Sequence, residues 1–156
     1  MCAAGASVAA CSGGATRSTG CSATPTPAAT PPSVQAGPLS ASADRATAQP
    51  GDRVQAEVVV SGPARVSAPC TGPVELVVVD VAGLHVHADT PPAAHGVPCG
   101  DVTVDAGRTV TYTITWTTDP TLPPGMYTVV LTLGTNPPLV LPVTLTATRR
   151  DGCSTS

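Results

Sequence analysis

Strict alternation of apolar and polar residues in TVTYTITWT, residues 109–117, is the feature that most restricts how this chain can fold. Side chains on a β-strand point to opposite faces in turn, so a period of two predicts a strand with one buried face. Val110, Tyr112, Ile114 and Trp116 would occupy that buried face, and threonines would fill the other. We therefore expect Trp116 to be the central anchor of the core.

The same period recurs along the rest of the chain. Strands are expected over residues 53–60, 74–81, 84–88, 109–117, 127–133 and 139–147, with weaker segments at 39–43 and 102–104. The 18 prolines and 15 glycines supply turns between these segments and disfavour long helices. Seven or eight short strands at this spacing predict an all-β fold, which we interpret as an antiparallel β-sandwich; a small barrel would show the same pattern. Pro142 marks an edge strand, because proline cannot donate to a ladder.

Composition determines the kind of core and excludes one class of partner. Apolar residues make up 42% of the chain but include no phenylalanine, one tryptophan and two tyrosines, so the core must be mainly aliphatic. The seven cationic residues are all arginines spread along the chain, and the net charge is −3. Binding to a phosphate backbone needs clustered positive charge. Nucleic acid is therefore not an expected partner.

Residues 8–11, VAAC, resemble the lipobox of bacterial exported lipoproteins, in which the cysteine, here Cys11, receives diacylglycerol. A signal peptide also carries a basic region and 7 to 15 apolar residues, whereas only ten residues precede Cys11 and the first cation is Arg17. Either translation starts upstream and Met1 lies inside the apolar region, or the match is accidental and the protein is cytoplasmic. We favour the first alternative, with residues 1–11 as signal remnant and lipobox, and expect a lipid anchor on the outer face of the cytoplasmic membrane.

Residues 12–37 consist mostly of Ser, Thr, Gly, Ala and Pro and include PTPAATPP at 25–32. Such a composition cannot bury enough apolar surface to offset the entropy of ordering, which predicts a disordered tether. At about 3.1 Å per residue in an extended proline-rich conformation, the tether would hold a domain on the order of 50 to 80 Å from the membrane. The folded domain is expected over residues 38–148, followed by a flexible tail at 149–156.

The number of cysteines that would remain after export is even, which is consistent with an exported protein. Cleavage before Cys11 would remove Cys2 and acylate Cys11, and the remaining cysteines would be Cys21, Cys70, Cys99 and Cys153. An even number suits an oxidising compartment, whereas a cytoplasmic location would leave free thiols. Three pairings are possible. We favour a Cys70–Cys99 disulfide, because both residues lie in proline-flanked loops beside strands, and the other two lie near the chain ends.

Two runs of sequence, VELVVVDVAGLHVH and VDAGRTVTYTITWTTDPTLPPGMYTVVLTLG, resemble the bacterial intracellular proteinase inhibitor (BsuPI-type) domain family. The similarity spans about residues 51–134. Its matching features are Asp80, Gly83, Gly107, Trp116, Pro124, Gly125 and Tyr127. The resemblance implies an Ig-like β-sandwich and inhibition of a protease.

A proline-rich loop, TPPAAHGVPCGD at residues 90–101, is the candidate binding segment. Its proline content and a crosslink at Cys99 would make it rigid and lower the entropy lost on binding. The residues expected to contact a ligand are Thr90, Pro91, Pro92, His95 and Pro98.

His85 and His87 are weak candidates for a metal site. Residues two apart on a strand share a face, so this pair could chelate Zn²⁺ or Cu²⁺. The simpler alternative places Leu84, Val86 and Ala88 in the core and leaves both histidines in solvent.

Sequence motifs give no support for an enzyme or a cofactor: no G-x-S-x-G elbow, Gly-rich phosphate loop or recognisable Cys/His nucleophile pair occurs. We therefore expect a non-enzymatic envelope lipoprotein whose Ig-like module binds another protein or a cell-wall component, through loops or an exposed edge strand. The second hypothesis is a proteinase inhibitor acting through residues 90–101. The third is a metal-binding envelope protein that uses His85 and His87.

Overall fold

The computed structural model describes residues 29–147, so Cys11, Cys21, Cys153 and the predicted tail lie outside the described residues. Eleven strands and no helix occur in this range. None of its elements is a helix that could cross a membrane. The strands are β1 (Ser33–Ala36), β2 (Leu39–Ala43), β3 (Thr47–Ala48), β4 (Arg53–Ser61), β5 (Ala64–Ala68), β6 (Val74–Val79), β7 (His85–Asp89), β8 (Gly100–Val104), β9 (Thr109–Thr117), β10 (Gly125–Leu133) and β11 (Leu139–Leu145).

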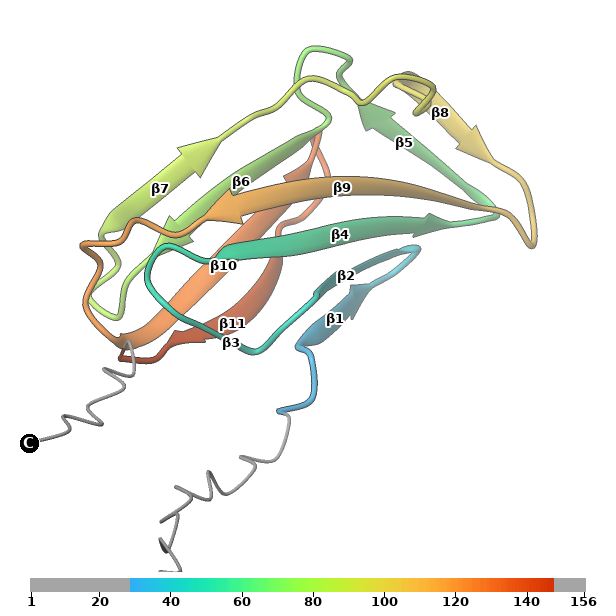
Figure 1. Ribbon diagram of the computed structural model, residues 1–156. Coiled ribbons are helices and arrows are strands. Elements are labelled where there is room, and N and C mark those ends of the chain that lie inside the picture. The colour runs from blue at the N-terminus through green and yellow to red at the C-terminus, as the bar shows by residue number, and fades with distance from the viewer. Residues whose placement is uncertain (1–28, 148–156) are drawn as a thin grey trace, which may run out of the picture.

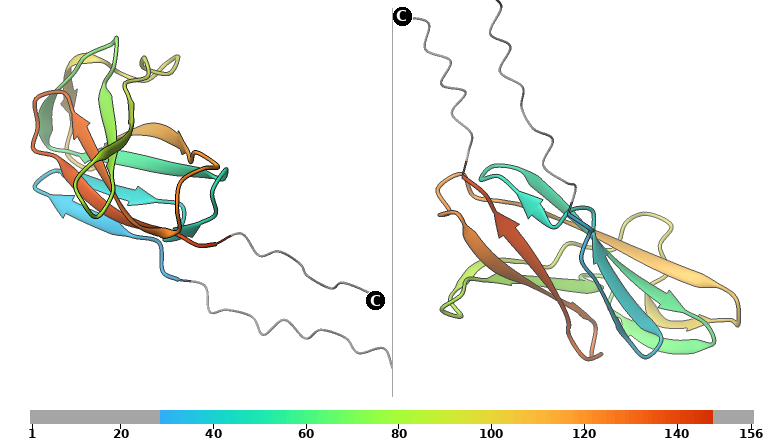
Figure 2. Two further views of the ribbon diagram at one scale, coloured as in Figure 1. Left: turned by 90° about the vertical axis from the view of Figure 1, so that its left-hand side faces the viewer. Right: turned by 90° about the horizontal axis from the view of Figure 1, so that it is seen from below.

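Two main sheets pack face to face (Figures 1 and 2). One has the order β1-β2-β4-β9 and the other β3-β11-β10-β6-β7, while β5 and β8 form a separate two-stranded sheet. All pairs are antiparallel except β3 with β11. The predicted all-β antiparallel sandwich is thus confirmed in place of the barrel.

Connectivity of the two sheets is Ig-like. Strands β2, β4 and β9 take the places of A, B and E in an Ig sheet, and β6, β10 and β11 take those of C, F and G. The Tyr127 hydroxyl at the start of β10 donates to the Pro123 carbonyl, with 2.8 Å between the oxygens. A tyrosine bonded back to the preceding loop at this corner is a recurring feature of Ig-like sandwiches.

The core lies between the two sheets and is built from alternate residues of each strand. In β9, Tyr112, Ile114 and Trp116 are buried, while the threonines between them are exposed, as the period of two predicts. Trp116 is 1% exposed, and its ring centroid lies 6.2 Å from that of Tyr127. The predicted aromatic anchor therefore bridges the two sheets.

The folded domain begins earlier than the sequence predicts. Residues 33–36 were expected to belong to the 12–37 tether, but they form β1, which pairs with β2 through a turn at Gly37. Gly37 has a φ of +60°, a conformation that glycine adopts without strain. The segment SVQA has few apolar residues and its side chains are at most half-buried, so its strand is stabilised by pairing with β2 rather than by its own apolar pattern.

Three strands, β1, β3 and β5, were not predicted, so the total is eleven rather than seven or eight. Strand β3 has only two residues, which is too short for any periodicity. Strand β5, ARVSA, does alternate: Val66 and Ala68 are buried and Arg65 is exposed. Its alanines and a preceding proline conceal that pattern in the sequence.

The predicted 74–81 strand ends at Val79, two residues early. The Asp80 carboxylate accepts hydrogen bonds from the backbone N–H groups of Ala82 and Leu84 at 2.8 and 2.9 Å, which starts a turn instead. Asp side chains commonly stabilise turns in this way.

Candidate functional site

Cys70 and Cys99 form the predicted disulfide, with an S–S distance of 1.98 Å and Cα atoms 5.0 Å apart. Cys70 follows β5 and Cys99 directly precedes β8, and the last pair of that two-stranded sheet is Ala68 with Gly100. The crosslink therefore closes the end of the β5–β8 sheet and encloses β6 and β7 in its loop.

The predicted binding segment lies against the sandwich. The backbone N–H of Ala93 donates to the Cys70 carbonyl at 3.1 Å. The Tyr112 hydroxyl donates to the Pro98 carbonyl at 2.9 Å, and burial raises the pKa of this tyrosine. Val97 is half-buried and packs on the core.

Of the predicted contact residues, Pro91 is half-buried, and the exposed ones are Thr90, Pro92, His95 and Pro98. The last two residues of the predicted loop, Gly100 and Asp101, belong to β8 instead. The structure thus gives residues 90–99 a role in covering the side of the core, and their binding to a ligand stays a prediction.

The histidines of β7 do not share a face, contrary to the premise of the metal hypothesis. His87 pairs with Val78 and His85 with Val79, because a bulge interrupts the β6–β7 ladder between these residues of β6. Val78 is buried in the core, and Val79 lies on the other face. No group of three or more potential ligands for a metal occurs within residues 29–147.

The expected burial of Leu84, Val86 and Ala88, at and just before β7, is mostly wrong. Val86 is half-buried, but Leu84 is 65% exposed and Ala88 is exposed, so two of the three residues expected in the core are outside it. Bulges insert an extra residue and change the faces of those that follow. Nothing in the five-residue sequence of β7 signals this insertion.

Replacing His87 should stabilise the domain. Its Nε2 atom is shielded from solvent and has no hydrogen-bond partner in the described part of the chain. Removing an unsatisfied buried polar atom recovers its desolvation cost, so we expect His87→Leu to raise the free energy of unfolding by about 1 kcal/mol. The measurement is urea denaturation. His85→Leu, at an exposed position, is the control and should change the free energy of unfolding by less than about 0.5 kcal/mol. A decrease in the free energy of unfolding for His87→Leu would contradict the interpretation that the buried Nε2 atom destabilises the domain.

The outer edge of β9 carries backbone groups that no described strand bonds. At the two ends of the β4–β9 ladder, Thr118 N–H donates to the Asp52 carbonyl and Gly62 N–H donates to the Arg108 carbonyl, both at 2.9 Å. Antiparallel ladders bond at every second pair, so the even-numbered residues of β9 bond to β4.

The odd-numbered residues of β9 therefore direct their N–H and C=O groups away from β4. All five are threonines with exposed side chains: Thr109, Thr111, Thr113, Thr115 and Thr117. Within residues 29–147, no other strand pairs with this edge.

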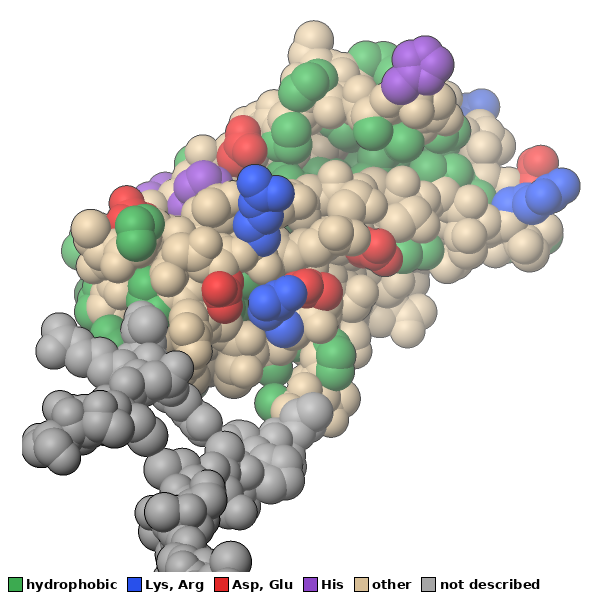
Figure 3. Space-filling view, in the orientation of Figure 1, with side chains coloured by type: hydrophobic (Ala, Val, Ile, Leu, Met, Phe, Trp, Pro, Cys, Tyr) green, Lys and Arg blue, Asp and Glu red, His purple; other side chains and the backbone are tan. Residues whose placement is uncertain are grey.

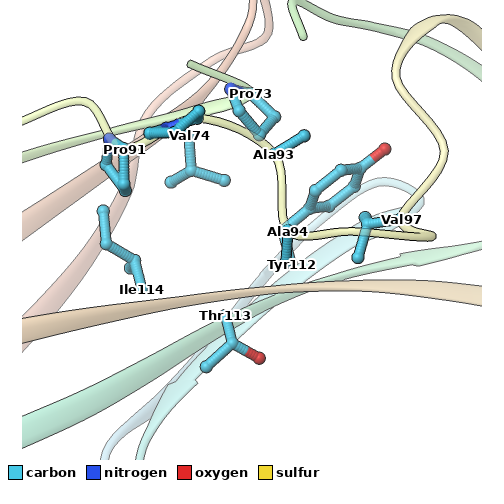
Figure 4. A pocket seen from close by; sticks show the side chains of 10 residues that line it. Pro73, Val74, Pro91, Ala93, Ala94, Val97, Tyr112, Thr113 and Ile114 are labelled. Carbon is cyan, nitrogen blue, oxygen red and sulfur yellow. The ribbon is translucent and has the colours of Figure 1, made fainter. Parts of the chain in front are cut away.

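A small apolar pocket lies beside this edge (Figure 4). Its volume is about 30 Å³, and its lining includes Tyr112 and Ile114 of β9, Val74 of β6, and Pro91 and Val97 of the covering segment. Figure 3 shows hydrophobic side chains gathered between β9 and the segment above it. The pocket thus opens at the side of the sandwich where the two sheets are joined by residues 90–99.

A second apolar surface lies at one end of the sandwich. Val81 and Met126, which are 85% and 59% exposed, line a groove of about 160 Å³ together with Leu122, Pro123 and Pro124. The sequence gives no sign of this groove, because the pattern of residues 74–81 predicts a strand that includes Val81.

Comparisons with known proteins do not assign the chain to a family. No family model matches it, and no curated protein matches it. Among solved structures, it is similar to a family 123 glycoside hydrolase from Clostridium perfringens, with a TM-score of 0.35 and 12% sequence identity over 64% of this chain. The chain spans only 21% of that enzyme's length.

Proposed function

We propose that this protein is a non-enzymatic envelope lipoprotein whose Ig-like sandwich binds another protein. The observation that carries the proposal is the outer edge of β9, where five residues present backbone groups that pair with no other strand within residues 29–147 and carry no charged side chain. Natural sheets usually protect such an edge with charges, prolines or bulges. An edge strand without these features is suited to pairing with a partner strand.

The disulfide supports an extracytoplasmic location. Disulfides persist in oxidising compartments and are rare in the cytosol, where thiols are kept reduced. The Cys70–Cys99 bond joins two segments of the folded domain and lies at the end of the β5–β8 ladder, next to its last residue pair. It agrees with the export that the VAAC motif at Cys11 implies.

Inhibition of a protease is the second candidate, because residues 90–99 are held rigid. The segment is fixed by the Cys99 disulfide, by the Ala93–Cys70 hydrogen bond and by the Tyr112–Pro98 hydrogen bond. A rigid loop loses little entropy on binding. Residual activity of a panel of serine proteases, measured with the oxidised protein, discriminates this candidate from the first.

Acylation of Cys11 tests the anchor. Behind a basic and apolar leader segment in a bacterial host, the wild-type chain should incorporate a fatty acid analogue, and Cys11→Ala should not. The readout is labelling of the purified protein after metabolic feeding. Equal labelling of both proteins, or of neither, would contradict the anchor.

Binding is tested in the envelope itself. A photo-crosslinking amino acid placed at Thr111 should give a defined adduct with another envelope protein, because this side chain is exposed beside the open edge. The same amino acid at Val140, an exposed position on β11 in the other sheet, is the control and should not give that adduct. Identical adducts from both positions, or none from Thr111, would argue against a binding role for this edge.

A further inference from the structure

We propose that β9 accepts one extended segment of a partner protein as an added antiparallel strand, with a small aliphatic side chain seated in the pocket beside it. This inference rests on the proposed function and specifies the partner's chemistry. It starts from the absence of a strand next to β9 in the described structure. An Ig sheet of this type has the order A, B, E, D, in which D pairs with E.

The chain's own candidate for the D position pairs elsewhere. Strand β8 precedes β9 in sequence, as D precedes E, but it pairs with β5 over five residues. The pairing is fixed by the buried side chains of Val102 and Val104 and by the disulfide next to Gly100. Among the described strands, none is therefore left to pair with the outer edge of β9 unless the β5–β8 sheet rearranges.

The pairing pattern of β9 dictates how an added strand would lie. Its odd-numbered threonines offer N–H and C=O groups to the partner, as derived from the β4–β9 ladder. Residues of the partner that face Tyr112 and Ile114 would point to the same side as these two, because directly opposite residues in a ladder share a face. That side is the pocket, which both residues line.

Pocket size and lining select the guest side chain. A volume of about 30 Å³ holds roughly two water molecules or a small aliphatic group, and an aromatic ring does not fit. Val74, Pro91 and Val97 provide apolar walls. A charged guest would be desolvated there without a counterion, which is costly. The partner segment should therefore alternate Ala or Val with polar residues.

A partner strand fits this site better than a second copy of the chain. Two β9 edges paired about Thr113 would place Ile114 of one copy opposite Tyr112 of the other. These side chains are already buried in their own cores, at 2% exposure each, so neither could enter the pocket of the other copy. A free extended segment can both bond to the edge and fill the pocket, which the β9 edge of a second copy cannot do.

The probe is a pair of labelled, end-capped peptides, Lys-Thr-Val-Thr-Val-Thr-Lys and its counterpart with Glu in place of Val, titrated into the oxidised full chain by fluorescence anisotropy. We expect the Val peptide to bind at least about tenfold more tightly than the Glu peptide. Thr113→Pro should weaken binding of the Val peptide by about tenfold or more, because it removes an N–H donor from the edge. Val140→Ala, at an exposed position of β11 in the other sheet, is the control and should bind within about threefold of the wild type.

Thr113→Pro should still fold, since the Thr113 N–H makes no bond to β4 and the chain already accommodates Pro142 within β11. If it does not fold, Ala94→Leu provides an independent test, because Ala94 is exposed and lines the pocket. This variant should weaken binding of the Val peptide by roughly tenfold.

Three results would overturn the inference: no saturable binding of the Val peptide, equal binding of both peptides, or unchanged binding by the folded Thr113→Pro protein. Self-association in sedimentation experiments that Thr113→Pro abolishes would assign the edge to a second copy and overturn it as well. The proposed function is judged separately. A defined envelope adduct from Thr111 combined with no peptide binding would leave a binding role intact and reject only this description of the partner.

Discussion

Trp116→Ala should lower the free energy of unfolding by about 3 to 5 kcal/mol, the range found when a large buried aromatic residue is truncated. Trp116 is 1% exposed, and it contacts Tyr127 across the two sheets. The other buried hydrophobic residues are aliphatic except for two tyrosines, so truncation removes the largest side chain of the core and leaves a cavity. Since small domains have a total stability of about 5 to 15 kcal/mol, this one change removes a large part of it.

Two control variants make the Trp116 prediction specific. Thr115→Ala alters the adjacent exposed residue and should change stability by less than about 0.5 kcal/mol. Trp116→Phe keeps an aromatic ring but removes an indole N–H that has no hydrogen-bond partner among residues 29–147, so it should cost clearly less than Trp116→Ala. Denaturant melts that give equal losses for Trp116→Ala and Thr115→Ala would mean that the faces of β9 are assigned wrongly.

Sequence reasoning succeeded where one face of a strand carries large apolar residues. The bounds of β9 were predicted to the residue, because Val110, Tyr112, Ile114 and Trp116 alternate with threonines without interruption. It failed for β1 and β3, whose polar or very short segments are stabilised by neighbouring strands rather than by their own pattern.

The candidate site was only partly predictable for a related reason. Cys70 and Cys99 could be paired in advance, because their loops adjoin strands and few alternatives existed. The threonine row of β9 is visible in the sequence, but its position at an edge depends on β8 pairing with β5, which is a long-range choice. The β7 bulge, which separates His85 from His87, is likewise set by the β6 register.

Reduction of the Cys70–Cys99 bond should lower the free energy of unfolding by about 3 to 4 kcal/mol, the loop-entropy estimate for a crosslink of this span. The two cysteines are 29 residues apart, and the loop between them contains β6, a central strand of the five-stranded sheet. The crosslink also helps to fix residues 90–99, which are held in addition by the hydrogen bonds of Ala93 and Tyr112 and by packing of Val97 on the core.

The loss of stability on reduction is measured by urea denaturation with and without dithiothreitol, and non-reducing peptide mapping verifies the pairing. In a Cys70→Ala/Cys99→Ala double variant, dithiothreitol should have no further effect on stability, which separates this bond from any other thiol chemistry of the chain. The double variant should also bind the Val peptide more weakly, because the segment that forms one wall of the pocket is no longer fixed at Cys99. A loss of less than about 1 kcal/mol would show that strand pairing between β5 and β8 holds this region without the crosslink.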